Sequence, residues 1–125
     1  MLEIEIGGEV YQFNFGFGFL REINKTQKVT SEGISKEIGF QLKVSGLLDG
    51  DVLDLVDILY TANAGQKPRA TRHALESYIE DPETDVDSLF TEVLDFLKRN
   101  NVTKKQTAQA VEVWEKQLEK QLSKA

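Results

Sequence analysis

Residues 11–20 read YQFNFGFGFL, and every second residue from Tyr11 to Phe19 is aromatic. Successive side chains of a β-strand point to opposite sides, so this alternation is typical of a strand with one apolar face. Such a face has two interpretations. It packs on the protein's own core, which we favour, or part of it binds a second protein.

The residues before this stretch complete a β-hairpin. Residues 2–6, LEIEI, alternate apolar and acidic side chains, and Gly7 and Gly8 follow. A Gly-Gly pair suits a two-residue hairpin turn in which both central residues have positive φ. We therefore predict a hairpin over residues 2–15 that packs on helices, because an isolated hairpin is only marginally stable in water.

The pattern changes after Gly16, where glycine permits a sharp bend of the chain. Phe17, Leu20 and Ile23 recur at helical spacing. Three of the aromatic residues therefore belong to a strand, and we expect Phe17 and Phe19 to start the first helix.

The next segment is ambiguous. Residues 25–33 read as a loop. Residues 34–48 fit a helix through Ile34, Ile38 and Leu42, although part of the segment also fits a strand. We predict a helix here.

Four later segments have apolar side chains at helical spacing. They are residues 49–66, residues 72–81, the stretch from Thr84 or Asp85 to Arg99, and the stretch from Thr103 to about Leu122. Each has a polar residue that can cap its N-terminus. The predicted caps are Asp49 or Asp51, Thr71, Thr84 or Asp85, and Thr103 in a capping box with Gln106.

Together these elements predict an α+β fold that is mostly α-helical, with an N-terminal β-hairpin packed on a bundle of about five or six helices. We expect residues 1–102 to form a hairpin plus helical core domain. Residues 103–125 are expected to form a C-terminal amphipathic helix that projects or binds a partner.

Composition limits the class of protein. The chain has 125 residues, is 40% hydrophobic and 29% charged, and carries a net charge of −6. This is too apolar for a disordered chain and too charged for a membrane protein, and it lacks the basic footprint of a nucleic-acid-binding protein. There is no cysteine, which fits a reducing compartment, and the N-terminus lacks the pattern of a signal peptide.

Charge is unevenly distributed along the chain. Residues 76–95 contain eight acids and no base, whereas residues 98–125 contain seven bases and three acids. This asymmetry predicts two solvated helix faces, with attraction within the chain or between copies as the alternative.

No catalytic or metal site is predicted. His73 is the single histidine and has no acids at metal-ligand spacing. The segment DGDVLDLVD lacks the ligand pattern of a calcium loop, and GFGFLR has Arg21 where a phosphate-binding loop needs its third glycine. We therefore expect no cofactor, no metal ion and no enzymatic activity.

A narrow apolar stripe marks the last predicted helix. Its members are Val111, Trp114, Leu118 and Leu122. The stripe docks on its own domain or meets a helix of a second copy or a partner. Because tryptophan often dominates the binding energy of an interface, we predict that these four residues, together with Phe17 and Phe19, bind a partner.

The order of these elements resembles the tail assembly chaperone family of long-tailed phages and prophages of Gram-positive bacteria. The resemblance rests on the phrases FGFGFLREINK, GDVLDLVDILYTAN, ALESYIED and VDSLFTEVLDFL. It covers roughly residues 2–105, whereas the tail KKQTAQAVEVWEKQLEKQLSKA lies largely outside it.

The resemblance implies a function and partners. Family members are small proteins encoded between the tail tube protein and the tape measure protein. They hold the tape measure soluble and help tube subunits assemble around it in the host bacterial cytoplasm, and they are absent from the mature virion. A ribosomal frameshift often adds a second domain that contacts the tube protein. The family supplies no catalytic residue.

These implications lead to the expectation of a non-catalytic chaperone that binds the tape measure protein, the tail tube protein or both, with self-association as a further possibility. Nucleic acid and membranes are not expected partners. The alternative is a structural tail-completion or head–tail joining protein of the virion. A third interpretation, an acidic mimic of DNA, is weaker because four of the eight acids crowd one loop, Asp81, Glu83, Asp85 and Asp87.

Overall fold

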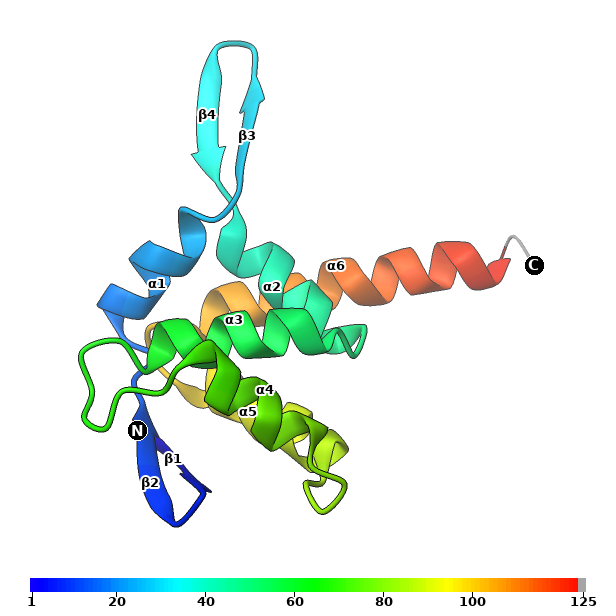
Figure 1. Cartoon of the computed structure of the whole chain (residues 1–125). Coiled ribbons are helices and arrows are strands. Elements are labelled where there is room, and N and C mark those ends of the chain that lie inside the picture. Colours follow the sequence, from blue (N-terminus) through cyan, green and yellow to red (C-terminus); the bar gives the residue numbers. More distant parts are fainter. Residues whose placement is uncertain (124–125) are drawn as a thin grey trace.

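The computed structural model describes residues 1–123, which form six helices and four short strands (Figure 1). The chain is 59% helical and 15% strand, so the prediction of a mostly helical α+β fold is confirmed. The helices are α1 (Phe17–Asn24), α2 (Gly39–Leu48), α3 (Val52–Ala62), α4 (Arg72–Glu80), α5 (Val86–Arg99) and α6 (Lys104–Ser123).

The predicted N-terminal hairpin is present. Strands β1 (Leu2–Ile6) and β2 (Glu9–Phe13) pair in antiparallel register. Gly7 and Gly8 join them with φ angles of 60° and 85°, as a two-residue turn of this type requires. The apolar side of the hairpin is buried against the helices, and the other side carries Glu3 and Glu5 in solvent.

A second hairpin was not predicted. Strands β3 (Lys28–Ser31) and β4 (Ile34–Glu37) pair where the sequence analysis placed a loop and the start of a helix, so both predictions are wrong there. Glu32 and Gly33 make the turn with φ angles of 51° and 79°. All residues of both strands are exposed, and the hairpin extends away from the helices (Figure 1). An apolar periodicity in a sequence arises where one face of an element is buried. Because neither face of this hairpin is buried, its sequence carries no such periodicity.

Most predicted helix caps are confirmed. The carboxylate of Asp51 accepts hydrogen bonds from two backbone N–H groups of α3. Thr71 accepts one from Ala74, and Asp85 accepts one from Ser88. Thr103 differs from its prediction, because its buried hydroxyl donates to the Leu97 carbonyl oxygen at 2.8 Å instead of capping α6 with Gln106.

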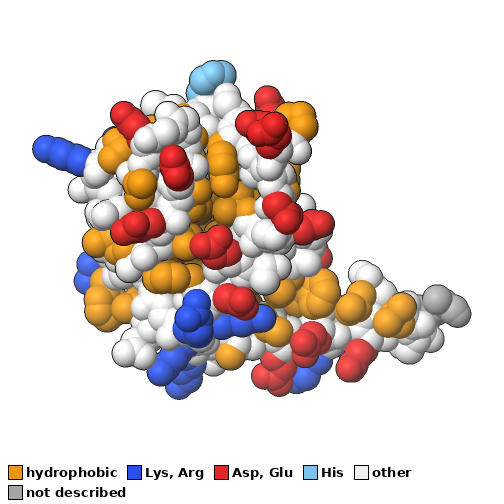
Figure 2. Space-filling view, turned by 90° about the horizontal axis from the view of Figure 1, so that it is seen from below, with side chains coloured by type: hydrophobic (Ala, Val, Ile, Leu, Met, Phe, Trp, Pro, Cys, Tyr) orange, Lys and Arg blue, Asp and Glu red, His pale blue; other side chains and the backbone are white. Residues whose placement is uncertain are grey.

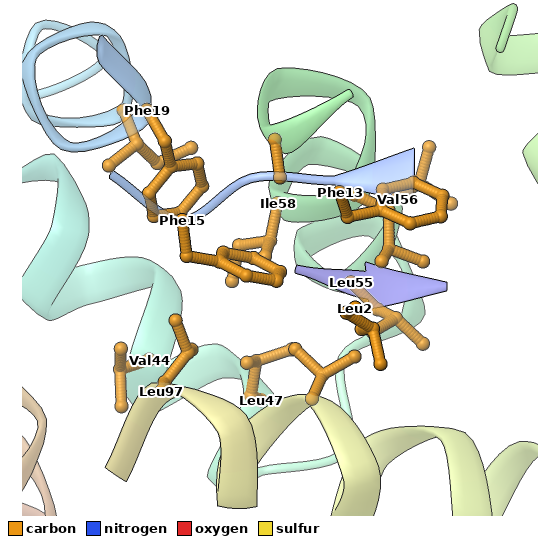
Figure 3. Packing of buried hydrophobic residues seen from close by; sticks show 14 of the residues in the cluster. Leu2, Phe13, Phe15, Phe19, Val44, Leu47, Leu55, Val56, Ile58 and Leu97 are labelled. Carbon is orange, nitrogen blue, oxygen red and sulfur yellow. The ribbon is translucent and has the colours of Figure 1, made fainter. Parts of the chain in front are cut away.

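The core lies where the first hairpin meets α1, α2, α3 and α5 (Figure 3). Phe15 occupies its centre, with its ring 5.0 Å from that of Phe19 and 5.4 Å from that of Phe96. The apolar face of α3 contributes Leu55 and Ile58 to the same core. The ladder of aromatics is therefore mainly a core feature.

Asn63 joins the first hairpin to the end of α3. This side chain is fully buried, and its amide nitrogen donates to the carbonyl oxygens of Gln12 and Pro68 at 2.9 and 3.3 Å. Its amide oxygen accepts from the backbone N–H of Ala70 at 2.6 Å and from the Arg69 guanidinium at 3.0 Å. One polar residue thus holds the outer edge of β2 and the loop after α3 in place.

The first half of α6 packs on α2 and α5, and the second half extends beyond the body of the molecule (Figure 1). Thr107 and Ala110 are buried in the first half. Residues 124 and 125, which the predicted C-terminal segment includes, lie outside the described residues. No helix within residues 1–123 has the length and apolar character needed to span a membrane.

Candidate partner-binding surface

The predicted stripe on α6 becomes more exposed toward the C-terminus. Ala110 is fully buried beside it, Val111 and Trp114 are half-buried, and Leu118 and Leu122 are 40% and 69% exposed. The same apolar face of α6 is therefore buried at its N-terminal end and exposed at its C-terminal end. Its N-terminal part contributes to the fold, and its C-terminal part presents leucines to solvent.

Trp114 fixes α6 at the point where it leaves the body. Its indole Nε1 donates a hydrogen bond of 2.6 Å to the carboxylate of Asp49, which ends α2. A hollow of about 150 Å³ next to this contact is lined by Ser45 and Asp49 of the α2 end and by Trp114, Gln117, Leu118 and Gln121 of α6. The indole is thus oriented by a polar partner, while its neighbours on the stripe remain accessible.

The charges around the stripe are asymmetric. At 100° per residue, Glu115 and Glu119 lie along one side of Leu118 and Leu122, whereas the glutamines at 117 and 121 lie along the other. Glu112 pairs with Lys116 at 3.0 Å on the exposed part of the helix. Figure 2 shows hydrophobic side chains on the projecting helix with acidic side chains beside them.

We name Trp114, Leu118 and Leu122 the α6 surface. Two further apolar residues, Val52 and Leu53, are exposed at the start of α3, directly after the turn that contains Asp49. Exposed apolar side chains therefore lie at the start of α3 as well as on α6. A partner helix laid on the α6 surface would cover it.

The two phenylalanines proposed for partner binding have different environments. Phe19 is 4% exposed and packs edge-on against Phe15 and Phe40 in the core. Phe17 is 63% exposed, with the Arg21 guanidinium 5.8 Å from its ring centroid. The structure therefore leaves Phe17, and not Phe19, on the surface.

Phe17 borders a hollow between the start of α1 and the end of α3. The hollow measures about 420 Å³ and is lined mainly by backbone and small side chains, including Gly16, Gly18, Ala62 and Gly65. It shares no lining residue with the hollow beside Trp114.

An ion-pair cluster holds α2 to α3. The Lys43 ammonium lies 3.1 Å from Asp54 and 2.9 Å from Asp57, and Arg72 also pairs with Asp57. Burial acts to lower the pKa of Lys43, but hydrogen bonds to the two carboxylates outweigh this and raise it. Burial likewise acts to raise the pKa of Asp57, and its two cationic partners lower it instead. The charged forms of Lys43 and Asp57 are therefore both stabilised, which suits a structural clamp.

His73 is exposed on α4. Within residues 1–123, no three His, Cys, Asp or Glu side chains are arranged to hold a metal ion. What α6 offers chemically is apolar contact area with a polar edge.

Sequence reasoning identified the stripe but missed how α6 is anchored. Thr103, Thr107 and Ala110 are all buried, and their spacing of four and three residues continues the stripe toward the N-terminus. These small side chains do not register as an apolar pattern, although their spacing was a usable signal. The bond from Trp114 to Asp49 joins residues 65 positions apart and had no local signal.

One comparison with known proteins gave a match. A family model described as phage tail assembly chaperone protein, TAC, matches residues 3–112. The match spans both hairpins, α1 to α5 and the first part of α6, and it ends two residues before Trp114. Searches of curated proteins and of solved structures found no match.

Proposed function

Because the chain belongs to the phage tail assembly chaperone family, we propose that it binds the tape measure protein during tail assembly through the α6 surface, without catalysis. The tail tube protein is a second proposed partner. The proposed place of action is the host bacterial cytoplasm, and the protein is proposed to be absent from the mature virion.

The exposure of Leu118 and Leu122 is the observation that supports this proposal. A tape measure protein is a long helical chain whose apolar stripes aggregate before the tube encloses them. A chaperone for it needs apolar contacts that can be exchanged, together with a net charge that keeps the complex soluble. The α6 surface supplies the first, and the net charge of −6 supplies the second.

Trp114 is the expected anchor of this interface. It is half-buried and held by Asp49, so it loses little conformational entropy when a partner covers it. Its position at the junction of body and projecting helix lets a bound helix contact both. Trp114→Ala is expected to reduce association with the tape measure protein, or self-association, more than it reduces stability.

Co-expression tests the proposal. The chain is produced with the tape measure protein of the same phage, and the soluble fraction of the tape measure is measured with and without the chain. We expect solubility to depend on the chain, and Leu118→Ser/Leu122→Ser to abolish this effect without lowering the melting temperature. Val29→Ser/Ile34→Ser is the matched control, since it removes two exposed apolar residues from the second hairpin.

Two results would contradict the proposal. One is a tape measure protein whose soluble fraction is the same with and without the chain. The same holds if the α6 variant pair and the second-hairpin variant pair reduce this soluble fraction equally. The other is a stoichiometric amount of the chain in purified virions by mass spectrometry, which would favour the structural tail-completion or head–tail joining role.

A further inference from the structure

The outer edge of β1 is unpaired and faces a groove. The first sheet contains only β1 and β2. The outer edge of β2 is occupied, because Asn63 donates to the Gln12 carbonyl and the Ala62 carbonyl accepts from the Asn14 N–H. Among the described residues, no backbone hydrogen bond links β1 to any element except β2.

The register shows which backbone groups of β1 are free. Opposite residues of an antiparallel pair exchange both hydrogen bonds or neither. Gln12 directs its carbonyl to Asn63, away from β1, and Glu3 lies opposite Gln12. The N–H and C=O groups of Glu3, and of Glu5 two residues later, therefore point outward from the sheet.

The groove beside this edge lies between β1 and the helices α4 and α5. It measures about 370 Å³ and is lined by Glu3, Ile4 and Glu5 on one side and by Tyr78, Asp85, Ser88, Leu89 and Glu92 on the other. In Figure 2 a hollow with hydrophobic side chains separates two ridges, and acidic side chains stand on both. A strand edge facing a helix across an apolar floor is the geometry in which an extended peptide adds to a sheet.

The charges of the groove define the occupant. Four carboxylates line it, from Glu3, Glu5, Asp85 and Glu92, and no lysine or arginine does. None of these four takes part in an ion pair within residues 1–123. Hydrogen bonds from the Ser88 backbone and hydroxyl lower the pKa of Asp85, so this carboxylate stays charged to a lower pH than an ordinary aspartate.

We propose that this groove binds an extended segment of a tail protein, in which apolar residues alternate with lysine or arginine, by adding it as a third strand to β1. Side chains on one face of the added strand lie over Ile4 and Leu89. Those on the other face lie beside Glu3 and Glu5, where opposite charges across neighbouring strands stabilise the pairing. Acidic strands are excluded by repulsion.

This inference rests on the proposed function for the origin of the segment, but it concerns a different surface from α6. A peptide binding test on the purified chain separates the two, because it needs no tape measure protein. A failure of peptide binding would not affect the co-expression result for the α6 surface. A failure of the co-expression test would likewise not affect peptide binding to the groove.

The probe is a fluorescent peptide of about seven residues, a common strand length, with alternating lysine and valine. Fluorescence anisotropy measures its affinity for the full chain. We expect Glu3→Lys/Glu5→Lys to weaken binding by about tenfold or more. Glu115→Lys/Glu119→Lys on α6 is the matched control, with an identical charge change outside the groove, and should retain at least half of the affinity.

Amide hydrogen exchange identifies the mode of binding. The outward N–H groups of Glu3 and Glu5 should exchange fast in the free chain and slowly with peptide bound, while that of Ile4, which faces β2, changes little. A peptide N-methylated at its lysines keeps its charges but loses the N–H donors that face Glu3 and Glu5 in an antiparallel pairing, and it should bind at least about tenfold more weakly.

Several outcomes would overturn the proposal. They are the absence of peptide binding, an equal loss of peptide affinity in the two charge-reversal variants, and Glu3 and Glu5 amides that remain unprotected from exchange when the peptide is bound. Protection of these amides without peptide in a dimer of the chain would assign the edge to a second copy instead.

Discussion

The two hairpins of this protein have the same secondary structure and opposite environments. In β1–β2 the alternate residues Leu2, Ile4 and Phe13 are buried. In β3–β4 no residue is buried, and the ribbon stands away from the helices (Figure 1). Hairpin geometry is therefore compatible with two very different contributions to the fold.

From this difference we predict that attachment to the helices, and not strand pairing, determines how much each hairpin contributes to the stability of the protein. An isolated two-stranded hairpin is marginal in water. β1–β2 is attached by its apolar face and by hydrogen bonds from Asn63. β3–β4 is attached through its base, where the Phe40 N–H at the start of α2 donates to the Asn24 side-chain oxygen at the end of α1 at 3.0 Å. The predictions below test these attachments.

The largest effect is expected for Phe15→Ala, which removes the central aromatic contact of the first hairpin. Phe15 is buried and lies against Phe19 and Phe96. Truncation of a buried phenylalanine costs about 3–5 kcal/mol. Urea unfolding measures the loss, and a change below about 1 kcal/mol would mean that this face is not the anchor of the hairpin.

Asn63→Ala tests the polar attachment of the first hairpin and should cost about 2–3 kcal/mol. The substitution leaves the Gln12 carbonyl and the Ala70 N–H without their partner. Asn14→Ala is the matched control, because it removes the same amide from an exposed position. Equal stability of the two variants would contradict a structural role for the Asn63 hydrogen bonds.

The first hairpin could be predicted from sequence because burial imposes alternation on its residues. The second could not, because its residues contact solvent on both faces and no periodicity is required of them. Its turn at Glu32 and Gly33 and the β-branched residues beside it, Val29 and Thr30, were the remaining signal. Ile34 and Ile38 matched a helical spacing by coincidence, and this extended the predicted α2 too far upstream.

For the candidate partner-binding residues, the sequence pattern indicated which side chains form a stripe but not which of them are exposed. The stripe of Trp114, Leu118 and Leu122 followed from helical periodicity, and its exposure agrees with a surface role. Phe19 was included with Phe17 because both belong to the aromatic ladder, but only a three-dimensional arrangement separates the buried ring from the exposed one. The groove beside β1 joins residues more than 70 positions apart, so no local pattern could indicate it.

Gly39→Ala tests the base of the second hairpin, where the chain enters α2. A Cβ at this buried position would collide with the Ile23 carbonyl oxygen of α1, which is backbone and cannot move freely. We expect a loss of about 1–3 kcal/mol, as for other overpacked sites.

Gly18→Ala is the control for this substitution. It adds the same methyl group in α1, where nothing lies within 4 Å, and should stabilise the protein by about 0.5–1 kcal/mol. If both variants unfold at the same urea concentration, the contact between Gly39 and α1 is not tight in solution.

The smallest effect is expected for Ile34→Ala in the second hairpin. Ile34 is 73% exposed, so its truncation removes little buried area and should change stability by less than about 0.5 kcal/mol. The comparison with Ile4→Ala on β1 is the sharpest form of the contrast, because the same side chain is removed from a strand of the other hairpin. Ile4 is buried, and its loss should cost about 2–4 kcal/mol. A comparable loss at Ile34 would mean that β3–β4 packs on another surface in solution, and a second copy of the chain would then be the first candidate, testable by the concentration dependence of the melting temperature.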